Sequence, residues 1–221
     1  MNAGYFITGT DTNIGKTWSA VALMRALQLR GQIVNGMKPV AAGCEWMQGG
    51  WKNQDALLLQ QYSSGAFDYR KINPYAFKKP VSPHIACGAV AVDIDVILAD
   101  FRYLQSFSDL VLVEGAGGWF SPLSKSWDNA YFARALQLPV ILVVGLRLGC
   151  INHARLTYQA VKQSGLQVAG WLAVKVDVNM QSCQANLDYL HACIDAPCWG
   201  VLPNMPNADF KELAKSITVI K

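Results

Sequence analysis

Residues 5–17 decide the fold of this chain and read Tyr5-Phe6-Ile7-Thr8-Gly9-Thr10-Asp11-Thr12-Asn13-Ile14-Gly15-Lys16-Thr17. The apolar start predicts a buried strand, which runs through a glycine-bounded loop into a helix that begins near Lys16. Backbone N–H groups of such a loop, with the positive end of the helix, point at phosphate oxygens. Five residues separate Gly9 from Gly15, one more than in the usual pattern. The stretch predicts a nucleoside triphosphate site rather than a turn that only joins strand to helix.

The residues of this loop have separate expected tasks. Asn13, Ile14 and Gly15 offer backbone N–H groups to the phosphates. The Lys16 ammonium group reaches the terminal phosphates, and the Thr17 hydroxyl is placed to bind Mg²⁺. The following segment, 16–30, has helical character, and Gly31 is a plausible stop.

Length and composition bound the remaining possibilities. At 221 residues and 24.2 kDa the chain predicts one domain, 1–221. Apolar residues make up 52% and charged residues 15%, so apolar surface must remain exposed, as at an oligomer interface or a large substrate cleft. The net charge of +4 is dispersed, which argues against a nucleic-acid partner.

Cysteine usage and hydropathy indicate the compartment. Six cysteines occur without a Cys-x-x-Cys pair, and the first core strand begins where a secretory leader would lie. We therefore expect a cytoplasmic protein with reduced thiols. No apolar run approaches the roughly 20 residues needed to cross a bilayer, so no membrane association is expected.

Short β-branched runs alternate with helical patterns along the chain. The expected strands are residues 5–8, 33–40, 110–113, 140–144, 168–174 and 199–202. The expected helices are residues 16–30, 54–62, 93–105, 128–136, 150–164, 181–193 and 209–216. This alternation predicts an α/β fold: a three-layer, doubly wound, mostly parallel sheet of the P-loop NTPase type.

Residues just after the strands carry functional weight because ligands bind beyond the carboxyl ends of parallel strands. Lys38 stands among apolar neighbours at one strand end, where it needs an anionic partner unless it extends to solvent. Glu114 follows an apolar strand and precedes a glycine-rich turn, a place where nucleotide enzymes hold Mg²⁺, although it could also pair with a surface lysine. Asp55, near a helix start, is either a helix-start anion or a second metal carboxylate.

The ordered set of motifs resembles the dethiobiotin synthetase family from about residue 5 to residue 173. The segments that carry this resemblance are Gly9–Thr17, Lys38-Pro-Val-Ala-Ala-Gly43, Asp55, Asn73-Pro-Tyr-Ala-Phe77, Ser82-Pro-His84, Glu114-Gly-Ala-Gly-Gly118 and Leu148-Gly-Cys-Ile-Asn-His153. Each motif occurs in other P-loop proteins, but the ordered set is specific.

The resemblance implies an ATP-dependent ligase that makes dethiobiotin from 7,8-diaminononanoate and CO₂, with Mg²⁺, in biotin biosynthesis. It assigns Lys16 to the β- and γ-phosphates, Lys38 to the carbamate and γ-phosphate, and Thr12 to the reacting end of the substrate. Thr17, Asp55 and Glu114 are then the Mg²⁺ ligands, hard oxygen donors for a hard ion. The glycine-rich segment completes the site: Gly115, Ala116 and Gly117 beside the nucleotide, and Gly117 and Gly118 beside the substrate.

The resemblance also implies a homodimer in which the substrate's carboxylate reaches a helix start of the second subunit. Gly149, Cys150 and Asn152 match that place, and a helix N-terminus suits an anion. An ordinary glycine-led helix start is the alternative reading of the same residues.

Two departures from the family pattern affect the expected site. Ala42 replaces a serine, which removes a hydroxyl near the carbamate. Val174 and Lys175 stand where the family often has Asn-Asp to read adenine, and neither side chain pairs a donor with an acceptor. The preference for ATP should then be relaxed, or be set by the backbone around Pro203, Asn204 and Met205.

The sequence also has to be weighed against three other functions. A nucleotide-switch ATPase of the same P-loop class typically carries a second lysine five positions before the loop lysine, where this chain has Asp11. A cobyrinic acid amide-forming ligase needs a glutamine-hydrolysing domain, for which 221 residues leave little room. A non-enzymatic binding module would not need potential metal ligands and lysines at one edge of the sheet.

Overall fold

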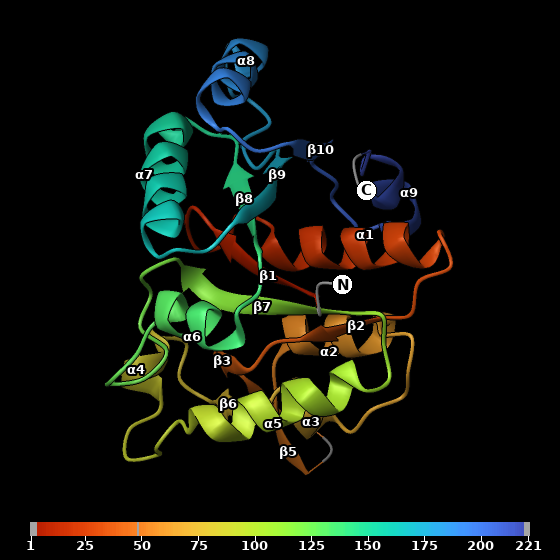
Figure 1. The fold of residues 1–221 in the computed structure, drawn as a ribbon, viewed down its shortest axis with the longest axis vertical. Coiled ribbons are helices and arrows are strands. Elements are labelled where there is room, and N and C mark those ends of the chain that lie inside the picture. Colours follow the sequence, from red (N-terminus) through yellow and green to blue (C-terminus); the bar gives the residue numbers. More distant parts are fainter. Residues whose placement is uncertain (1–3, 48, 219–221) are drawn as a thin grey trace.

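The computed structural model describes residues 4–47 and 49–218. Its centre is a six-stranded sheet with the strand order β10-β9-β8-β1-β7-β2, in which all pairs are parallel (Figure 1). The strands are β1 (Gly4–Gly9), β2 (Val34–Met37), β7 (Leu110–Gly118), β8 (Val140–Gly145), β9 (Val168–Val174) and β10 (Cys198–Leu202). Parallel pairing brings the carboxyl ends of β1, β7 and β2 to one edge, where the glycine-bounded loop also lies.

Helices cover both faces of the sheet. One face carries α1 (Lys16–Gln28), α2 (Gln54–Tyr62) and α9 (Phe210–Lys215). The other carries α5 (Ile94–Gln105), α6 (Asn129–Leu136), α7 (Cys150–Gln163) and α8 (Cys183–Cys193). The result is the three-layer, doubly wound α/β fold that the alternation of strands and helices predicts.

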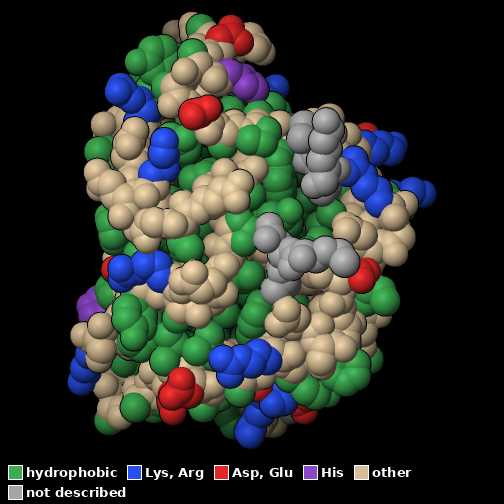
Figure 2. All heavy atoms as spheres, in the orientation of Figure 1, with side chains coloured by type: hydrophobic (Ala, Val, Ile, Leu, Met, Phe, Trp, Pro, Cys, Tyr) green, Lys and Arg blue, Asp and Glu red, His purple; other side chains and the backbone are tan. Residues whose placement is uncertain are grey.

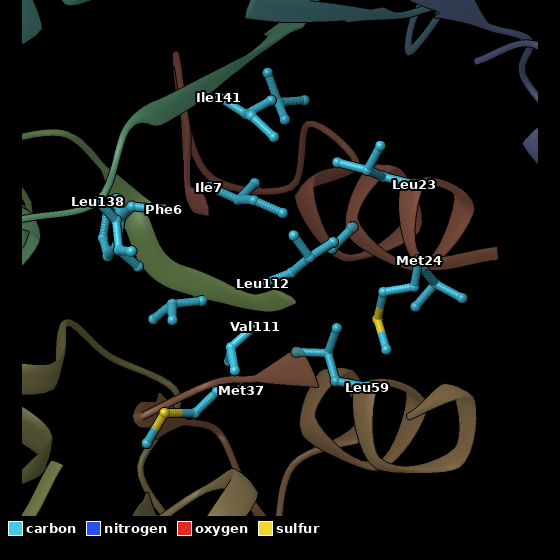
Figure 3. Packing of buried hydrophobic residues seen from close by; sticks show 14 of the residues in the cluster. Phe6, Ile7, Leu23, Met24, Met37, Leu59, Val111, Leu112, Leu138 and Ile141 are labelled. Atoms are coloured by element: carbon cyan, nitrogen blue, oxygen red, sulfur yellow. The ribbon is translucent and has the colours of Figure 1, made fainter. Parts of the chain in front are cut away.

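Successive side chains of a strand point to opposite faces of the sheet, so each strand contributes to the apolar core on both faces. In β1, Ile7 points toward α1, on the same side of the sheet as Leu112 of β7 and toward Leu23 of α1 (Figure 3). The neighbouring Phe6 points to the other side of the sheet, where its ring meets that of Phe132 in α6 edge-on. Because both faces of these strands are buried, the strands are continuously apolar rather than alternating. A second cluster under α7 and α8 contains Trp171, which is fully buried.

The predicted strand over residues 33–40 is wrong as a single element. It divides at Lys38 and Pro39 into β2 and a short strand β3 (Val40–Ala42), which leaves the main sheet to pair with β6 (Tyr75–Phe77). Proline lacks the N–H that a central strand requires, so the chain turns away at this point. Asn73 holds the break, because its amide donates to the Lys38 carbonyl at 2.6 Å.

The predicted end of the strand at Val113 is also wrong. β7 continues through Glu114 to Gly118, so the glycine-rich segment is strand and not turn. Ile7 of β1 pairs with Glu114, but Gly9 pairs with Gly118, so β7 carries two more residues than β1 between these points. The last residues of β7 therefore depart from regular pairing with β1.

Like β3 and β6, four further short elements were not predicted from the sequence. They are the antiparallel hairpin of β4 (Glu45–Met47) and β5 (Gly50–Lys52), and the helices α3 (Tyr69–Ile72) and α4 (Pro83–Ala86). They connect the sheet to the walls of the site. Within the described residues, no helix combines the length and apolar character needed to cross a bilayer. On the face in Figure 2, lysine and arginine side chains are scattered rather than gathered into a strip.

Candidate active site

A cavity of about 690 Å³ opens at the carboxyl edge of β1, β7 and β2. Its floor is the loop from Thr12 to Thr17, and one wall is the end of β7. The opposite wall comes from Ala41 and Ala42 of β3 and from residues 80–83 before and within α4. Lys38, Asp55 and Glu114 also line it. Residues spread over more than one hundred positions of sequence thus meet around one space large enough for a nucleotide's phosphates and a small substrate.

The phosphate loop is shaped by two left-handed residues. Gly15 has φ 86° and Asn13 has φ 56°, and the chain enters α1 directly after Gly15. A side chain at position 15 would press on Val174, whose methyl lies 3.0 Å from an added Cβ. Glycine is therefore required where the loop enters α1, and the start of this helix lines the cavity, a position that suits a phosphate.

Lys16 is buried and donates from Nζ to the backbone carbonyl of Asp11 at 2.7 Å. Burial lowers the pKa of Lys16 from its ordinary 10.5 to about 8, against a smaller opposing effect of Glu114. The ammonium group thus lies folded onto its own loop, and an anion in the cavity would restore the charge that burial disfavours.

Lys38 lies between two carboxylates. Its Nζ is 2.6 Å from Glu114 Oε1 and 3.0 Å from Asp55 Oδ2. Burial alone would lower the pKa of Lys38, but Glu114 and Asp55 together hold it above its ordinary value. For Asp55, burial would raise the pKa, yet attraction to Lys38 leaves it below the ordinary value. The pKa shifts of Lys38 and Asp55 thus both favour the ionised forms, so the ion pair between them is kept near neutral pH.

Three oxygen donors gather at this point. Glu114 Oε1 accepts from the Thr17 hydroxyl at 2.9 Å, while Glu114 Oε2 is buried without a hydrogen-bond partner. Asp55 is the second residue of α2, and Asn53 caps this helix by accepting from the N–H groups of Asp55 and Ala56. Because Asn53 caps, the Asp55 carboxylate is left to face Lys38. Lys16, Lys38, Asp55 and Glu114 all line the same cavity.

The end of β7 is held by Asn129, a residue that the sequence analysis did not select. Its fully buried amide nitrogen donates to the carbonyls of Ala116 at 2.8 Å and Gly118 at 2.7 Å. An added Cβ on Gly115 would lie 2.6 Å from its side-chain oxygen. Asn129 reads in the sequence only as part of a helix start, so nothing there distinguishes it from an ordinary cap.

Ser121 is a second residue that the sequence analysis missed. Its hydroxyl accepts from the Gly118 N–H at 2.8 Å and lies where a side chain on Gly117 would be, 2.4 Å from an added Cβ. Gly117, with φ 76°, therefore leaves room for Ser121 and for Thr12, whose hydroxyl is 3.7 Å from the same point.

The other predicted site residues lie outside the cavity of this single chain. Val174 and Lys175 follow β9, with Val174 buried and Lys175 exposed, and Pro203, Asn204 and Met205 follow β10. The Lys175 N–H donates to Leu202, and the Val174 carbonyl accepts from Leu146 and Val176. Gly149, with φ 91°, begins α7, and the side chain of Cys150 is buried beneath it.

Comparisons with known proteins agree on a family. The sequence profile of an AAA domain matches residues 3–212. The ATP-dependent dethiobiotin synthetase BioD of Xanthomonas euvesicatoria is 48% identical over 211 residues, covering 95% of this chain and 94% of that protein. The protein of the same name from Aromatoleum aromaticum is 48% identical over 215 residues, covering 96% of each.

Solved structures agree on the fold. The cell division protein MinD of Aquifex aeolicus superposes with a TM-score of 0.57 at 16% identity, covering 91% of this chain and 82% of that one. A ParA family ATPase of Chlorobium tepidum superposes with a TM-score of 0.58 at 13% identity, covering 98% and 90%. At these identities the likeness supports the P-loop fold alone.

Proposed function

We propose that this chain, which belongs to the ATP-dependent dethiobiotin synthetase family, is the ligase of biotin biosynthesis that closes a cyclic urea. Its substrates are 7,8-diaminononanoate, CO₂ and ATP, and its products are dethiobiotin, ADP and phosphate. The observation that carries the proposal is the convergence of two lysines and two carboxylates on the phosphate loop, with Lys38 within 3.0 Å of Asp55 and Glu114. The proposal treats residues 1–221 as one catalytic domain.

The reaction needs positioned cations more than covalent chemistry. One substrate amine adds to CO₂ to give a carbamate, and a carbamate oxygen attacks the γ-phosphate, releasing ADP. The second amine then attacks the carbonyl carbon of this mixed anhydride, and phosphate leaves as the ring closes. Negative charge accumulates on carbamate and phosphate oxygens throughout, so oriented positive groups lower the barrier.

The position of each side chain in the cavity indicates which charged group of the substrates it would contact. Lys16, once an anion draws it from the Asp11 carbonyl, neutralises the β- and γ-phosphates. Lys38 serves the carbamate and the transferred phosphoryl group. Thr12 and the side-chain-free Gly117 and Gly118 line the place of the reacting amines, and Ala42 leaves only backbone groups there. Asn13, Ile14 and Gly15 on one side and Gly115 and Ala116 on the other enclose the phosphates.

The donor set suits a magnesium ion. Thr17, Asp55 and Glu114 offer oxygen atoms only, and the unpartnered, buried Glu114 Oε2 is an atom that a cation would satisfy. These residues would hold Mg²⁺, which when bound neutralises charge on the phosphate oxygens. This assignment supports, in turn, the use of ATP as its magnesium complex.

The ends of the two substrates extend in opposite directions. Because Lys38, Asp55 and Glu114 mark the γ-phosphate on the β7–β2 side, the nucleoside lies toward β9 and β10. There Val174, Lys175 and residues 203–205 meet the base. In a homodimer, the substrate's carboxylate tail reaches Gly149, Cys150 and Asn152 of the partner subunit through the N–H groups of α7. The same proposal places the enzyme in the cytoplasm.

A product assay tests this function directly. Protein is mixed with diaminononanoate, bicarbonate, Mg²⁺ and ATP, and the products are separated by mass. The proposal expects dethiobiotin and phosphate in equal amounts. Phosphate release without urea would favour a nucleotide-switch ATPase instead.

Lys38→Ala separates chemistry from nucleotide binding. Because Lys38 acts on charge that develops during the reaction, we expect urea formation to fall below detection while nucleotide affinity stays within about tenfold. Turnover and calorimetric affinity are measured on the same preparation. Retention of more than about a tenth of wild-type turnover would remove Lys38 from the chemistry.

A further inference from the structure

The Lys38 ammonium group occupies the centre of the expected metal site. It lies between Asp55 Oδ2 and Glu114 Oε1, and the same Glu114 oxygen accepts from Thr17. Two of the three residues expected to hold a divalent cation, Asp55 and Glu114, are thus already paired with a monovalent one, and Thr17 is bonded to the second of them. The side chains of Lys38 and Glu114 are 7% and 1% exposed, whereas that of Asp55 is 44% exposed.

Because Glu114 is buried, its carboxylate needs a nearby cation, and in the nucleotide-free protein that cation is Lys38. A divalent cation and an ammonium group a few ångströms apart on the same oxygens repel each other strongly in a buried site. The two cations therefore compete for Asp55 and Glu114.

A triphosphate bound in the cavity would give Lys38 a new anionic partner. Lys38 and the phosphate loop line the same space, and a triphosphate bound there would place its terminal phosphate beside Nζ. Lysine has a flexible stem, so a short swing exchanges carboxylate partners for phosphate oxygens. A nucleotide alone supplies both the incoming metal's further ligands and the new partner for Lys38.

We propose that Lys38 is a placeholder cation: it fills the metal position in the nucleotide-free protein and leaves when metal and triphosphate enter together. The inference rests on the proposed function for the identity of the metal ligands. It states that the metal binds with the nucleotide and not before it, and that the displaced ammonium group is thereby delivered to the reacting phosphate.

A static ion pair is the competing explanation. In that case Lys38 only fastens α2 to the sheet, and a metal binds beside it through Glu114 Oε2 without displacing it. The free protein would then bind metal whether or not Lys38 is present.

Manganese binding distinguishes the two explanations without an activity assay. Mn²⁺ alone is titrated into wild type, Lys38→Ala and Lys38→Gln, and bound ion is read from the loss of the free-ion paramagnetic resonance signal. We expect wild type to bind Mn²⁺ weakly, and both variants to bind it at least about tenfold more tightly. With non-hydrolysable ATP analogue added, we expect wild type to retain one Mn²⁺ per nucleotide.

Lys71→Ala is the matched control. Lys71 pairs with the buried Asp100 on α5, away from the described cavity, so this variant also removes one positive charge from a buried carboxylate. It should bind Mn²⁺ as wild type does. Circular dichroism melting identifies any variant that fails to fold, and the wild-type titrations with and without analogue test the inference even then.

Two results would overturn the placeholder role. The first is nucleotide-free wild type that binds Mn²⁺ as tightly as the Lys38 variants; the second is wild type that binds it equally with and without analogue. Either leaves the ligase proposal intact. Failure of wild type to retain Mn²⁺ with analogue would instead remove the metal site on which both proposals depend, while the urea assay judges the ligase function separately.

Discussion

The ammonium group of Lys16 is buried, and the group that it donates to is a neutral backbone carbonyl. Burial lowers its pKa to about 8, whereas an unfolded lysine keeps the ordinary 10.5. Between these pH values the unfolded chain binds more protons than the folded one, so the penalty for this charge disappears as pH rises. Bound phosphate has the opposite effect, because it stabilises the ammonium form.

Nucleotide binding should therefore take up a proton above pH 8. We expect the dissociation constant of ADP to rise above that pH, approaching about tenfold per pH unit, because deprotonated Lys16 must first regain its proton. Calorimetry in buffers of different ionisation enthalpy measures the uptake. Lys16→Arg is the comparison, since arginine stays charged and should flatten the dependence. A flat wild-type profile from pH 7.5 to 9.5 would contradict the prediction.

Base selection is a second property that we expect single residues to set. Lys175 offers only donors and Val174 offers none from its side chain, while the Lys175 N–H is already bonded to Leu202. We expect relaxed discrimination among ATP, GTP and CTP, measured as kcat/KM for urea formation. The double variant Val174→Asn, Lys175→Asp should raise the preference for ATP by at least about tenfold. A wild-type preference for ATP of about a thousandfold would refute this.

At the scale of elements, the end of β7 depends on side-chain support. Strand pairing is irregular between Glu114 and Gly118, and Asn129 replaces the missing ladder bonds with its amide. This interlock requires Gly115, because any Cβ there would overlap the Asn129 oxygen. The position of Glu114 in the cavity thus depends on a helix that contributes no side chain to the cavity lining.

Gly115→Ala should disturb this interlock. The added methyl group must displace the fully buried Asn129, which we expect to cost about 1–3 kcal/mol of unfolding free energy and to lower turnover. Gly50→Ala is the control: its added Cβ meets nothing within 4 Å, so stability should change by less than about 0.5 kcal/mol. Urea denaturation measures both. Equal stability of the two variants would show that Asn129 yields without cost.

Sequence patterns predicted the regular elements and failed where tertiary contacts decide. The helix over residues 54–62 matches α2, and the core strands at β1, β8 and β9 lie where their apolar runs predict. The break at Lys38 and the extension of β7 depend on long-range contacts, Asn73 for the first and Asn129 for the second. Lys38 and Glu114 were selected from the sequence as charges beside apolar runs, and Asp55 as an anion near a helix start. A buried asparagine at a helix start has no such distinguishing pattern.

At the scale of the whole molecule, the proposed substrate site draws on two subunits. The start of α7 lies apart from the cavity, and the exposed Leu148 beside it is 94% accessible in the single chain. The Cys150 N–H is occupied by the Arg147 carbonyl, so the deeper N–H groups of this helix start remain for an anion. A second subunit that presents its α7 to the cavity would complete the site and cover this apolar surface.

Mixed dimers test whether active sites are shared. Asn152→Asp keeps the size of an exposed side chain but adds a negative charge that repels the substrate's carboxylate, so we expect a raised KM for the diamine. Asn152→Asp and Lys38→Ala homodimers should each be nearly inactive at low diamine. When subunits are exchanged, a site built from two chains predicts recovery of about a quarter of wild-type turnover, because half of the dimers carry one intact site. If each chain used its own α7, every site would keep one defect and mixing would recover nothing.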